Sequence, residues 1–437
     1  MTHSTTTTWT GLALGVLLAT ACAAPASEAP PAPTPAPATA AQPPAAAGPR
    51  IAAPGQGLSQ VGAGCVLPGG EVPVRPDAPA AGTAPPALKD VFREAFLIGA
   101  ALNARQFAER DQQGAALVRT HFSAITPENV LKWECVHPEP GRYDFAAPDR
   151  YVDFGRRNGM VVIGHALVWH NQTPSWVFQD AQGNPVSRDT LLARMREHIH
   201  TVVGRYKGRI TGWDVVNEAL NEDGTMRRSP WQRIIGDDFV EHAFRFAREA
   251  DPGAELYYND YSLENPAKRD GAVALVRRLQ SRGVRVDGIG TQEHQKMDWP
   301  SVALVDSMLT AFSALGVKIH VTELDVDVLP RATPSTGAEV TLRAEAEARL
   351  NPYAGGLPDS VQQALALRYA ELFAVYLKHR DAIERVTFWG VRDDDSWLND
   401  WPVRGRTNYP LLFDASGRKK PAFDAVVRTA RPTVVPD

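Results

Sequence analysis

Short apolar segments alternate with longer amphipathic segments along residues 96–391, and this alternation restricts the fold more than any other feature. Segments such as 161–170 have the length and β-branched content of buried strands, whereas 188–208 and 360–380 carry apolar residues at helical spacing. The strand candidates are residues 96–102, 122–129, 161–170, 210–218, 255–262, 286–294, 317–326 and 385–391. Eight strands separated by helices predict an α/β protein with a (β/α)8 TIM barrel.

A doubly wound open sheet is the alternative reading of the same alternation. That fold usually has fewer strands, and its nucleotide-binding members carry a glycine-rich fingerprint after one of them. Neither a GxGxxG sequence nor a P-loop follows any strand candidate here. We therefore favour the barrel, in which catalytic residues lie at the carboxyl ends of the strands.

Polar and aromatic side chains gather at those strand ends. The residues are Glu128, Asn129, His165, Trp169, His170, Asn217, Glu218, Asn259, Asp260, Gln292, His294, Glu323, Asp325 and Trp389. Alternation along a strand predicts that Glu323 and Asp325 point to one side. Asn217 and Glu218 are adjacent, so both reach one site only if their strand ends or bulges there.

Two carboxylates that flank one site are the equipment of glycoside hydrolysis. One acid protonates the leaving oxygen, and the other attacks the sugar or activates water. Trp169, Trp389, Trp397 and Lys132 suit a sugar ligand, because indole rings stack on sugar faces and an ammonium group donates to hydroxyls. The two acids, Glu218 and Glu323, lie on the fourth and seventh strand candidates.

Two other kinds of ligand agree less well with the sequence. A metal site built from His165, His170, Asp260, His294 and Asp325 is the alternative use of these residues, but the first strand lacks the histidine pair with which such sites often begin. The net charge of −4 gives no electrostatic reason to expect nucleic acid as a partner.

The N-terminal region reads as an export signal followed by a tether. An apolar run ends near Cys22, which is either lipidated, as in bacterial lipoproteins, or lost when the signal is cleaved after a nearby alanine. The predicted segments are a signal (1–22), an Ala/Pro-rich linker (23–56), an extension of uncertain structure (57–87) and the catalytic domain (88–433). We expect an exported monomer that is secreted, periplasmic or, if Cys22 is lipidated, anchored to the bacterial envelope through that lipid alone.

Three cysteines are present in the chain: Cys22, Cys65 and Cys135. They form no CxxC pair, which disfavours structural zinc. In an exported protein Cys65 and Cys135 could pair, although an odd total argues against a complete disulfide framework.

Seven motifs in the strand-end regions resemble glycoside hydrolase family 10, the endo-1,4-β-xylanases. They are TPENVLKWE, GHALVWHNQTPSWV, WDVVNEAL, YYNDYSLE, GIGTQEH, VTELDVDV and FWGVRDDDSW, in family order. The resemblance covers about residues 88–430 and implies hydrolysis of xylan or xylo-oligosaccharides without a cofactor or metal. Glu293 stands where the family usually has a small residue, and Gln295 where it commonly has an aromatic one.

The resemblance also implies a role for each matching residue. Glu218 would be the general acid/base and Glu323 the nucleophile of a retaining double displacement, with Asn217 holding the sugar 2-hydroxyl. His294 would hydrogen bond to Glu323, and Asp325 would support that histidine. The residues implied to line the non-reducing side are Glu128, Asn129, Lys132, His165, Trp169 and Gln292; Trp389 and Trp397 would cover the sugar at the cleavage point, and Asn259 and Tyr261 would lie toward the leaving group.

Two rival functions remain open at this point. The same residues could act on short xylo-oligosaccharides or aryl cellobiosides, or the chain could be a sugar-binding protein that has lost catalysis. A decayed binder would more often lack one of the two acids, and this sequence keeps Glu218 and Glu323 together with Asn217 and His294.

Overall fold

The computed structural model describes residues 64–65, 86–331 and 348–430. Chain contacts separate Met1–Gly55 from Gln56–Asp437, and all described residues belong to the second unit. The predicted signal, Cys22, the linker and most of the extension 57–87 lie outside the described residues. Among the described residues, no helix has the length and apolar character needed to cross a membrane.

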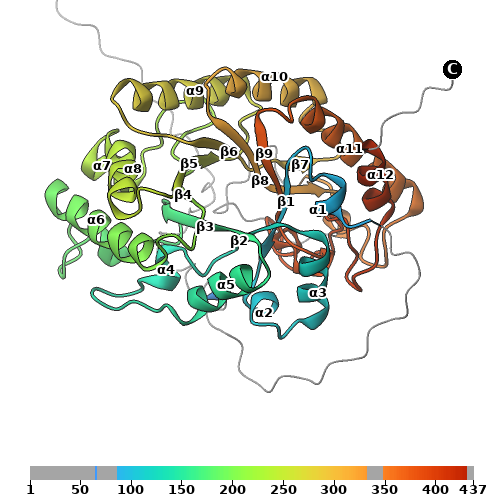
Figure 1. Ribbon diagram of the computed structural model, residues 1–437, viewed down its shortest axis with the longest axis horizontal. Coiled ribbons are helices and arrows are strands. Elements are labelled where there is room, and N and C mark those ends of the chain that lie inside the picture. The colour runs from blue at the N-terminus through green and yellow to red at the C-terminus, as the bar shows by residue number, and fades with distance from the viewer. Residues whose placement is uncertain (1–63, 66–85, 332–347, 431–437) are drawn as a thin grey trace, which may run out of the picture. The chain divides into compact units, whose positions relative to one another are not determined.

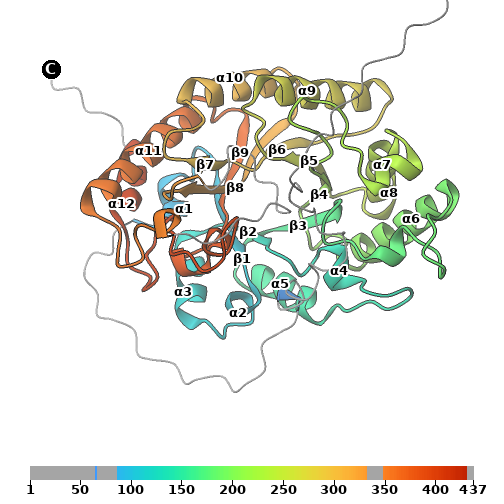
Figure 2. The same cartoon turned by 180° about the vertical axis from the view of Figure 1, so that it is seen from behind.

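A closed parallel barrel forms the centre of this unit (Figures 1 and 2). The strands follow the order β6-β5-β4-β3-β2-β1-β9-β8, and pairing of β6 with β8 closes the ring. Their bounds are β1 Leu97–Leu102, β2 Ala124–Pro127, β3 Val161–Val168, β4 Gly212–Asn217, β5 Glu255–Asp260, β6 Gly288–Thr291, β8 Lys318–Asp327 and β9 Ile383–Phe388. The predicted (β/α)8 barrel is confirmed, with Glu218 after its fourth strand and Glu323 on its seventh.

Helices surround the strands in both views. The helices are α1 Leu88–Val91, α2 Ala104–Phe107, α3 Gln112–His121, α4 Trp133–Val136, α5 Ala146–Arg157, α6 Arg188–Arg205, α7 Pro230–Ile235, α8 Phe239–Ala250, α9 Pro266–Ser281, α10 Val302–Ser313, α11 Asp359–Lys378 and α12 Pro421–Thr429. Ser187 begins α6 by accepting a hydrogen bond from the Thr190 amide, as the N-cap position requires. The predicted helices 188–208 and 360–380 correspond to α6 and α11.

One predicted strand, 286–294, is divided in the structure. It forms β6 and, after a break, the short strand β7, His294–Lys296, which pairs with the outer part of β8. The break lies at Glu293, whose φ of 61° is in the left-handed region and turns the chain out of the sheet. The buried side chain of Glu293 accepts hydrogen bonds from Thr291, Gln295 and, on α11, Tyr376.

Glycines on the strands make room for aromatic rings on the neighbouring strand. A Cβ added to Gly164 on β3 would lie 2.1 Å from the ring of Trp213 on β4. A Cβ on Gly212 would likewise lie 2.2 Å from the hydroxyl of Tyr257 on β5. Because an interior packed this tightly has no free volume, small and large residues must alternate between neighbouring strands.

The cysteine question left open by the sequence is answered by a Cys65–Cys135 disulfide, which joins residues 70 positions apart. Cys135 is buried on α4, and Cys65 belongs to the short described segment 64–65.

Candidate active site

Asn217 and Glu218 reach the same site because the strand ends between them. Asn217 is the last residue of β4, and Glu218 has a φ of 58° in the left-handed region. The turn directs both side chains into the barrel mouth, where Asn217 Nδ2 donates to Glu218 Oε1 at 3.1 Å. This is the strand end that the sequence required for both side chains to converge.

Glu218 is a buried carboxyl group with three side-chain donors. Trp169 Nε1 donates to Oε2 at 2.8 Å, and Gln292 Nε2 donates to Oε1 at 2.9 Å, alongside Asn217. Burial raises the pKa of Glu218, and the negative charge of Asp260 adds to this increase. The increase survives the opposing effect of the hydrogen bonds, so Glu218 is suited to hold and deliver a proton.

Glu323 has the opposite electrostatic surroundings. Its Oε1 accepts from Asn259 Nδ2 at 2.9 Å, and its Oε2 lies 3.3 Å from His294 Nε2. Burial works to raise the pKa of Glu323, but the hydrogen bond from His294 and the nearby positive charges outweigh burial and lower the pKa. Glu323 is therefore held as an ionised carboxylate.

His294 keeps its proton because it lies between two carboxylates. Its Nδ1 is 3.0 Å from Asp325 Oδ1, on the side opposite Glu323. Burial works to lower the pKa of His294, but the two carboxylates raise it to about 10. Asp325 is fully buried and also accepts from Trp397 Nε1 at 2.8 Å, which fixes both neighbours.

Two amide side chains connect the acids beneath the cleft. Asn259 Nδ2 donates to Asn217 Oδ1 at 3.0 Å as well as to Glu323, and Asn259 Oδ1 accepts from Thr322 at 2.7 Å. Asn259 is completely buried, so its place is below the carboxylates, with no surface open to a sugar. It holds the orientation of Asn217 and Glu323 relative to each other.

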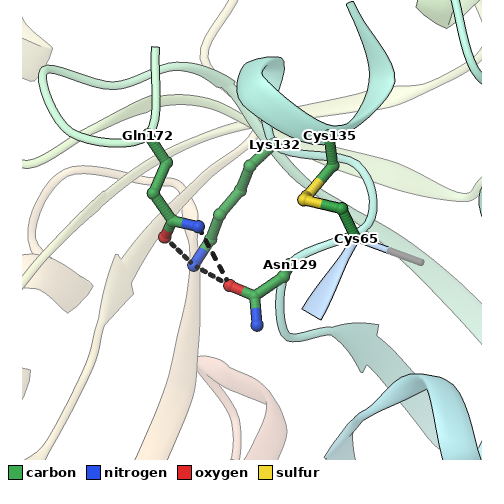
Figure 3. Close-up of a disulfide and its surroundings, with 5 residues drawn as sticks. All are labelled: Cys65, Asn129, Lys132, Cys135 and Gln172. Carbon is green, nitrogen blue, oxygen red and sulfur yellow. Dashed lines mark hydrogen bonds between the residues drawn. A yellow bond between two sulfur atoms is a disulfide. The ribbon is translucent and has the colours of Figure 1, made fainter. Parts of the chain in front are cut away.

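Lys132 and Asn129 occupy the side of the site that lies toward α4 (Figure 3). Lys132 Nζ donates to Asn129 Oδ1 at 3.2 Å and to Gln172 Oε1 at 2.9 Å, and it lies 4.8 Å from the centre of the Trp169 ring. Burial lowers the pKa of Lys132 to about 8, although Glu323 and Glu218 oppose that change. Burial also raises the pKa of Glu128 to about 8, with Asp395 adding to the effect.

His165 and two tryptophan rings also lie at the site. His165 Nδ1 lies 2.9 Å from Asp214 Oδ2, and its ring meets the Trp389 ring edge-on at 5.5 Å. The Trp397 ring lies 4.9 Å from the His294 ring. Trp389 and Trp397 therefore lie next to the histidines that adjoin Glu323.

Tyr261 is a buried side chain on the Glu218 side of the site. Arg227 donates to the Tyr261 hydroxyl at 2.7 Å and to the Glu218 carbonyl oxygen at 3.2 Å. The ammonium group of Lys268 lies 3.4 Å from the centre of the Tyr261 ring. The structure thus places Tyr261 beside Arg227 rather than against the carboxylates.

Sequence reasoning missed three residues of this site: Gln172, Asp214 and Arg227. Gln172 lies in the polar run HNQT after the third strand, and Asp214 is a lone acid inside the apolar strand 210–218; both were usable signals. Arg227 lies nine residues beyond Glu218 in a loop, where nothing in the sequence pattern marked it.

The residues that could have formed a metal site instead contact other protein side chains. Asp260 is 3.0 Å from Lys268, His165 pairs with Asp214, and His294 bridges Glu323 and Asp325. Within residues 64–65, 86–331 and 348–430, no group of three or more His, Cys, Asp or Glu side chains is placed to hold a metal ion.

A (β/α)8 barrel with two buried carboxylic acids of opposite pKa shift at its carboxyl-terminal mouth defines a glycoside hydrolase. The family model "Glycosyl hydrolase family 10" matches residues 87–429. The chain belongs to this family, as the motifs in the sequence indicated.

Named relatives and solved structures extend the similarity. Endo-1,4-beta-xylanase A of Xylanibacter ruminicola is 45% identical, and the match covers 78% of this chain and 93% of that protein. Beta-1,4-xylanase of Dictyoglomus thermophilum is 42% identical, over 78% of this chain and 91% of that protein. Among solved structures, a GH10 endoxylanase retrieved from a sugarcane soil metagenome is similar, with a TM-score of 0.77 and 45% sequence identity. The match covers 78% of this chain and 99% of the endoxylanase chain.

Proposed function

We propose that the protein is an endo-1,4-β-xylanase that cleaves the xylan backbone with retention of anomeric configuration. The observation that carries the proposal is the pair of acids with opposite pKa shifts, Glu218 raised and Glu323 lowered. Any glycosidase of this kind, retaining or inverting, needs one acid that keeps its proton and one that has lost it. Retention is the mechanism that membership of family 10 implies. The choice of xylan as the polysaccharide rests on the names of the relatives, which are xylanases.

In the first step, a carboxylate oxygen of Glu323 attacks the anomeric carbon of the sugar. The bond from that carbon to the bridging oxygen breaks while Glu218 transfers its proton to that oxygen. The products are a glycosyl ester on Glu323, a free sugar hydroxyl and an ionised Glu218. His294 and Asn259 hold Glu323 in place for the attack through the hydrogen bonds described above.

In the second step, water attacks the same carbon and the ester bond to Glu323 breaks. Glu218, now a carboxylate, accepts the proton that the water loses, so both acids return to their starting states. Asn217 lies beside Glu218 and is linked to Glu323 through Asn259, a position from which its amide can bind the sugar 2-hydroxyl.

The sugar chain extends from the acids in two directions in this proposal. On the non-reducing side it meets Glu128, Asn129, Lys132, His165, Trp169 and Gln292. Trp389 and Trp397 cover the sugar at the cleavage point. Tyr261 is assigned to the leaving-group side, where Arg227 connects it to the backbone of Glu218.

The test is hydrolysis of glucuronoxylan by the full-length chain, with product anomers followed by proton NMR and Glu323→Ala as the control. We expect β-anomers first, and a loss in the variant of at least about a thousandfold, because the covalent route disappears. Initial α-anomers would overturn double displacement, and wild-type protein that leaves xylan intact would overturn the xylanase assignment.

Export is a second part of the proposal, resting on the apolar run that ends near Cys22 and on the Ala/Pro-rich segment after it. We propose a lipid on Cys22 as the membrane link and a monomer as the functional state. Labelled palmitate should enter the wild-type chain and not Cys22→Ala when both are expressed in a bacterium. A dimer mass in light scattering would overturn the monomer.

A further inference from the structure

The Cys65–Cys135 disulfide ties a distant piece of chain to the edge of the active site. Cys135 lies on α4, whose N-cap residue is Lys132. Figure 3 shows the bridge beside Lys132, Asn129 and Gln172. Gly64 and Cys65 are both half-buried, as expected for residues packed against the barrel rather than extending from it.

Gly64 packs directly on the Asn129 side chain. A Cβ added to Gly64 would lie 2.9 Å from Asn129 Nδ2 and 3.3 Å from its Cγ, closer than carbon normally approaches either atom. The side-chain oxygen of Asn129, Oδ1, already accepts hydrogen bonds from Lys132 and Gln172. The amide is therefore enclosed between the cleft network and the main chain at residue 64.

A short series of contacts connects this position to the reacting groups. Asn129 accepts from Lys132, the Lys132 ammonium lies over the Trp169 ring, and Trp169 donates to the carboxyl group of Glu218. Gly64 thus lies at the outer end of the row of side chains that leads from the proton donor along one side of the cleft.

We infer that Gly64 and Cys65 form a specificity-determining edge at the Asn129 end of the cleft, which limits how far a xylan chain extends on the non-reducing side. This inference rests on the proposed function, which assigns Asn129 to that side. A sugar bound beyond Asn129 meets the main chain of these two residues. Because the disulfide fixes Cys65 to α4, the edge cannot move aside as an untethered segment would.

The experiment compares the full-length wild type with Cys65→Ser, Cys135→Ser and the double variant. Each is given xylo-oligosaccharides labelled with heavy oxygen at the reducing end, and mass spectrometry measures which bond is cut. Hydrolysis of a short aryl xylobioside, which does not reach beyond Asn129, reports the chemical step separately. A reductant supplies the matched control: dithiothreitol cleaves the bridge to two thiols in the wild type and has no bridge to cleave in the double variant.

We expect all three variants, and the reduced wild type, to cut more often at bonds that leave the longer product on the non-reducing side. The expected change is about fivefold, the size of one net hydrogen bond. Activity on the aryl xylobioside stays unchanged, and dithiothreitol leaves the double variant unaltered.

Two results would overturn the inference. Identical cleavage patterns in bridged and unbridged protein would show that the edge does not bound the cleft. A loss of efficiency on long substrates would show that Gly64 and Cys65 bind the chain instead of limiting it. If the wild type cuts neither xylo-oligosaccharides nor the aryl substrate, the proposed function fails, and that outcome is distinct from both.

Gly64→Ala tests the contact with the bridge intact. The added methyl group must displace the Asn129 amide, because it would lie 2.9 Å from Nδ2. We expect KM for xylo-oligosaccharides to rise about fivefold with kcat maintained, as expected when a binding contact is lost equally from ground and transition states. An unchanged KM would contradict the placement of Gly64 at the cleft.

Discussion

At the scale of single residues, the central feature is that two glutamates of the same chemistry have opposite pKa shifts. Both side chains are buried, so burial alone would raise the pKa of each. Glu218 receives hydrogen bonds mainly from neutral groups, whereas Glu323 faces the protonated His294. The neighbouring groups therefore determine which glutamate can act as the acid, Glu218, and which as the nucleophile, Glu323.

Replacing Glu218 by alanine should affect substrates unequally. Xylan, whose leaving group is a sugar hydroxyl, should be hydrolysed about 10²–10⁴-fold more slowly, because that oxygen departs only with a proton. A dinitrophenyl xylobioside has a leaving group that needs no proton, so formation of the glycosyl ester should persist and its burst should remain visible. Equal losses on both substrates would contradict the assignment of Glu218 as proton donor.

His294→Asn should shift the acidic limb of the pH profile of kcat/KM. Removing the cation and its hydrogen bond raises the pKa of Glu323, since both lower it in the wild type. Glu323 must be ionised to attack, so the acidic limb of kcat/KM should shift to higher pH. The basic limb, which depends on the proton of Glu218, should stay in place.

Asp325→Asn provides a contrasting control for the same measurement. It keeps the imidazole but removes one of the two charges that raise the pKa of His294 to about 10, so the pKa of His294 falls. Because His294 still titrates at higher pH than Glu323, it keeps its proton on the acidic limb, and that limb should not move to higher pH as it does in His294→Asn. An upward shift of the acidic limb in Asp325→Asn, or a shift of the basic limb in His294→Asn, would contradict this account of the site.

At the scale of the elements, the barrel depends on glycines that face aromatic rings on the next strand. Gly164→Ala should destabilise the protein by about 1–3 kcal/mol, the usual cost of overpacking a filled core. Gly204→Ala on α6 is the matched control, because its Cβ meets nothing within 4 Å and alanine favours a helix by about 0.5–1 kcal/mol. Urea unfolding followed by tryptophan fluorescence measures both, and a neutral Gly164→Ala would contradict the packing.

Strand positions were predictable because each is a local run of apolar residues, but the break within 286–294 was not. It depends on Glu293, which is held by Tyr376 from α11 and by two near neighbours. Gln295 is held in turn by Arg368. The two positions that depart from the family pattern thus belong to one buried polar network, and no local signal in the sequence reveals a partner so far along the chain.

The site residues also fall into two groups, those that the sequence could place and those that only the fold reveals. Glu218, Glu323 and Asn217 could be placed from strand ends alone, since the barrel brings those ends together. The resemblance assigns Asn259 to the leaving-group side, and the structure buries it in contact with Asn217 and Glu323. Strand position alone does not tell how deep a side chain lies. The partnership of Lys132 with Gln172 spans 40 residues and emerges only from the folded chain.

At the scale of the whole molecule, the disulfide fastens the chain ahead of the barrel to the barrel itself. Removing it in the double serine variant should lower the free energy of unfolding by about 2–4 kcal/mol, because the unfolded chain regains the freedom of a long loop. Thermal unfolding with and without dithiothreitol measures the effect. The reductant should lower the midpoint of the wild type alone, and a similar fall in the variant would exclude the bridge as its cause.

The short strand β7 has a consequence for protein engineering. It places His294 opposite Asp325 in the register of β8, so the histidine's partner is set by backbone pairing. Transplanting the two glutamates onto another barrel scaffold would therefore not carry the chemistry with them. The recipient would also need this additional strand and the turn before it, or burial would raise the pKa of its grafted nucleophile with no histidine placed to lower it.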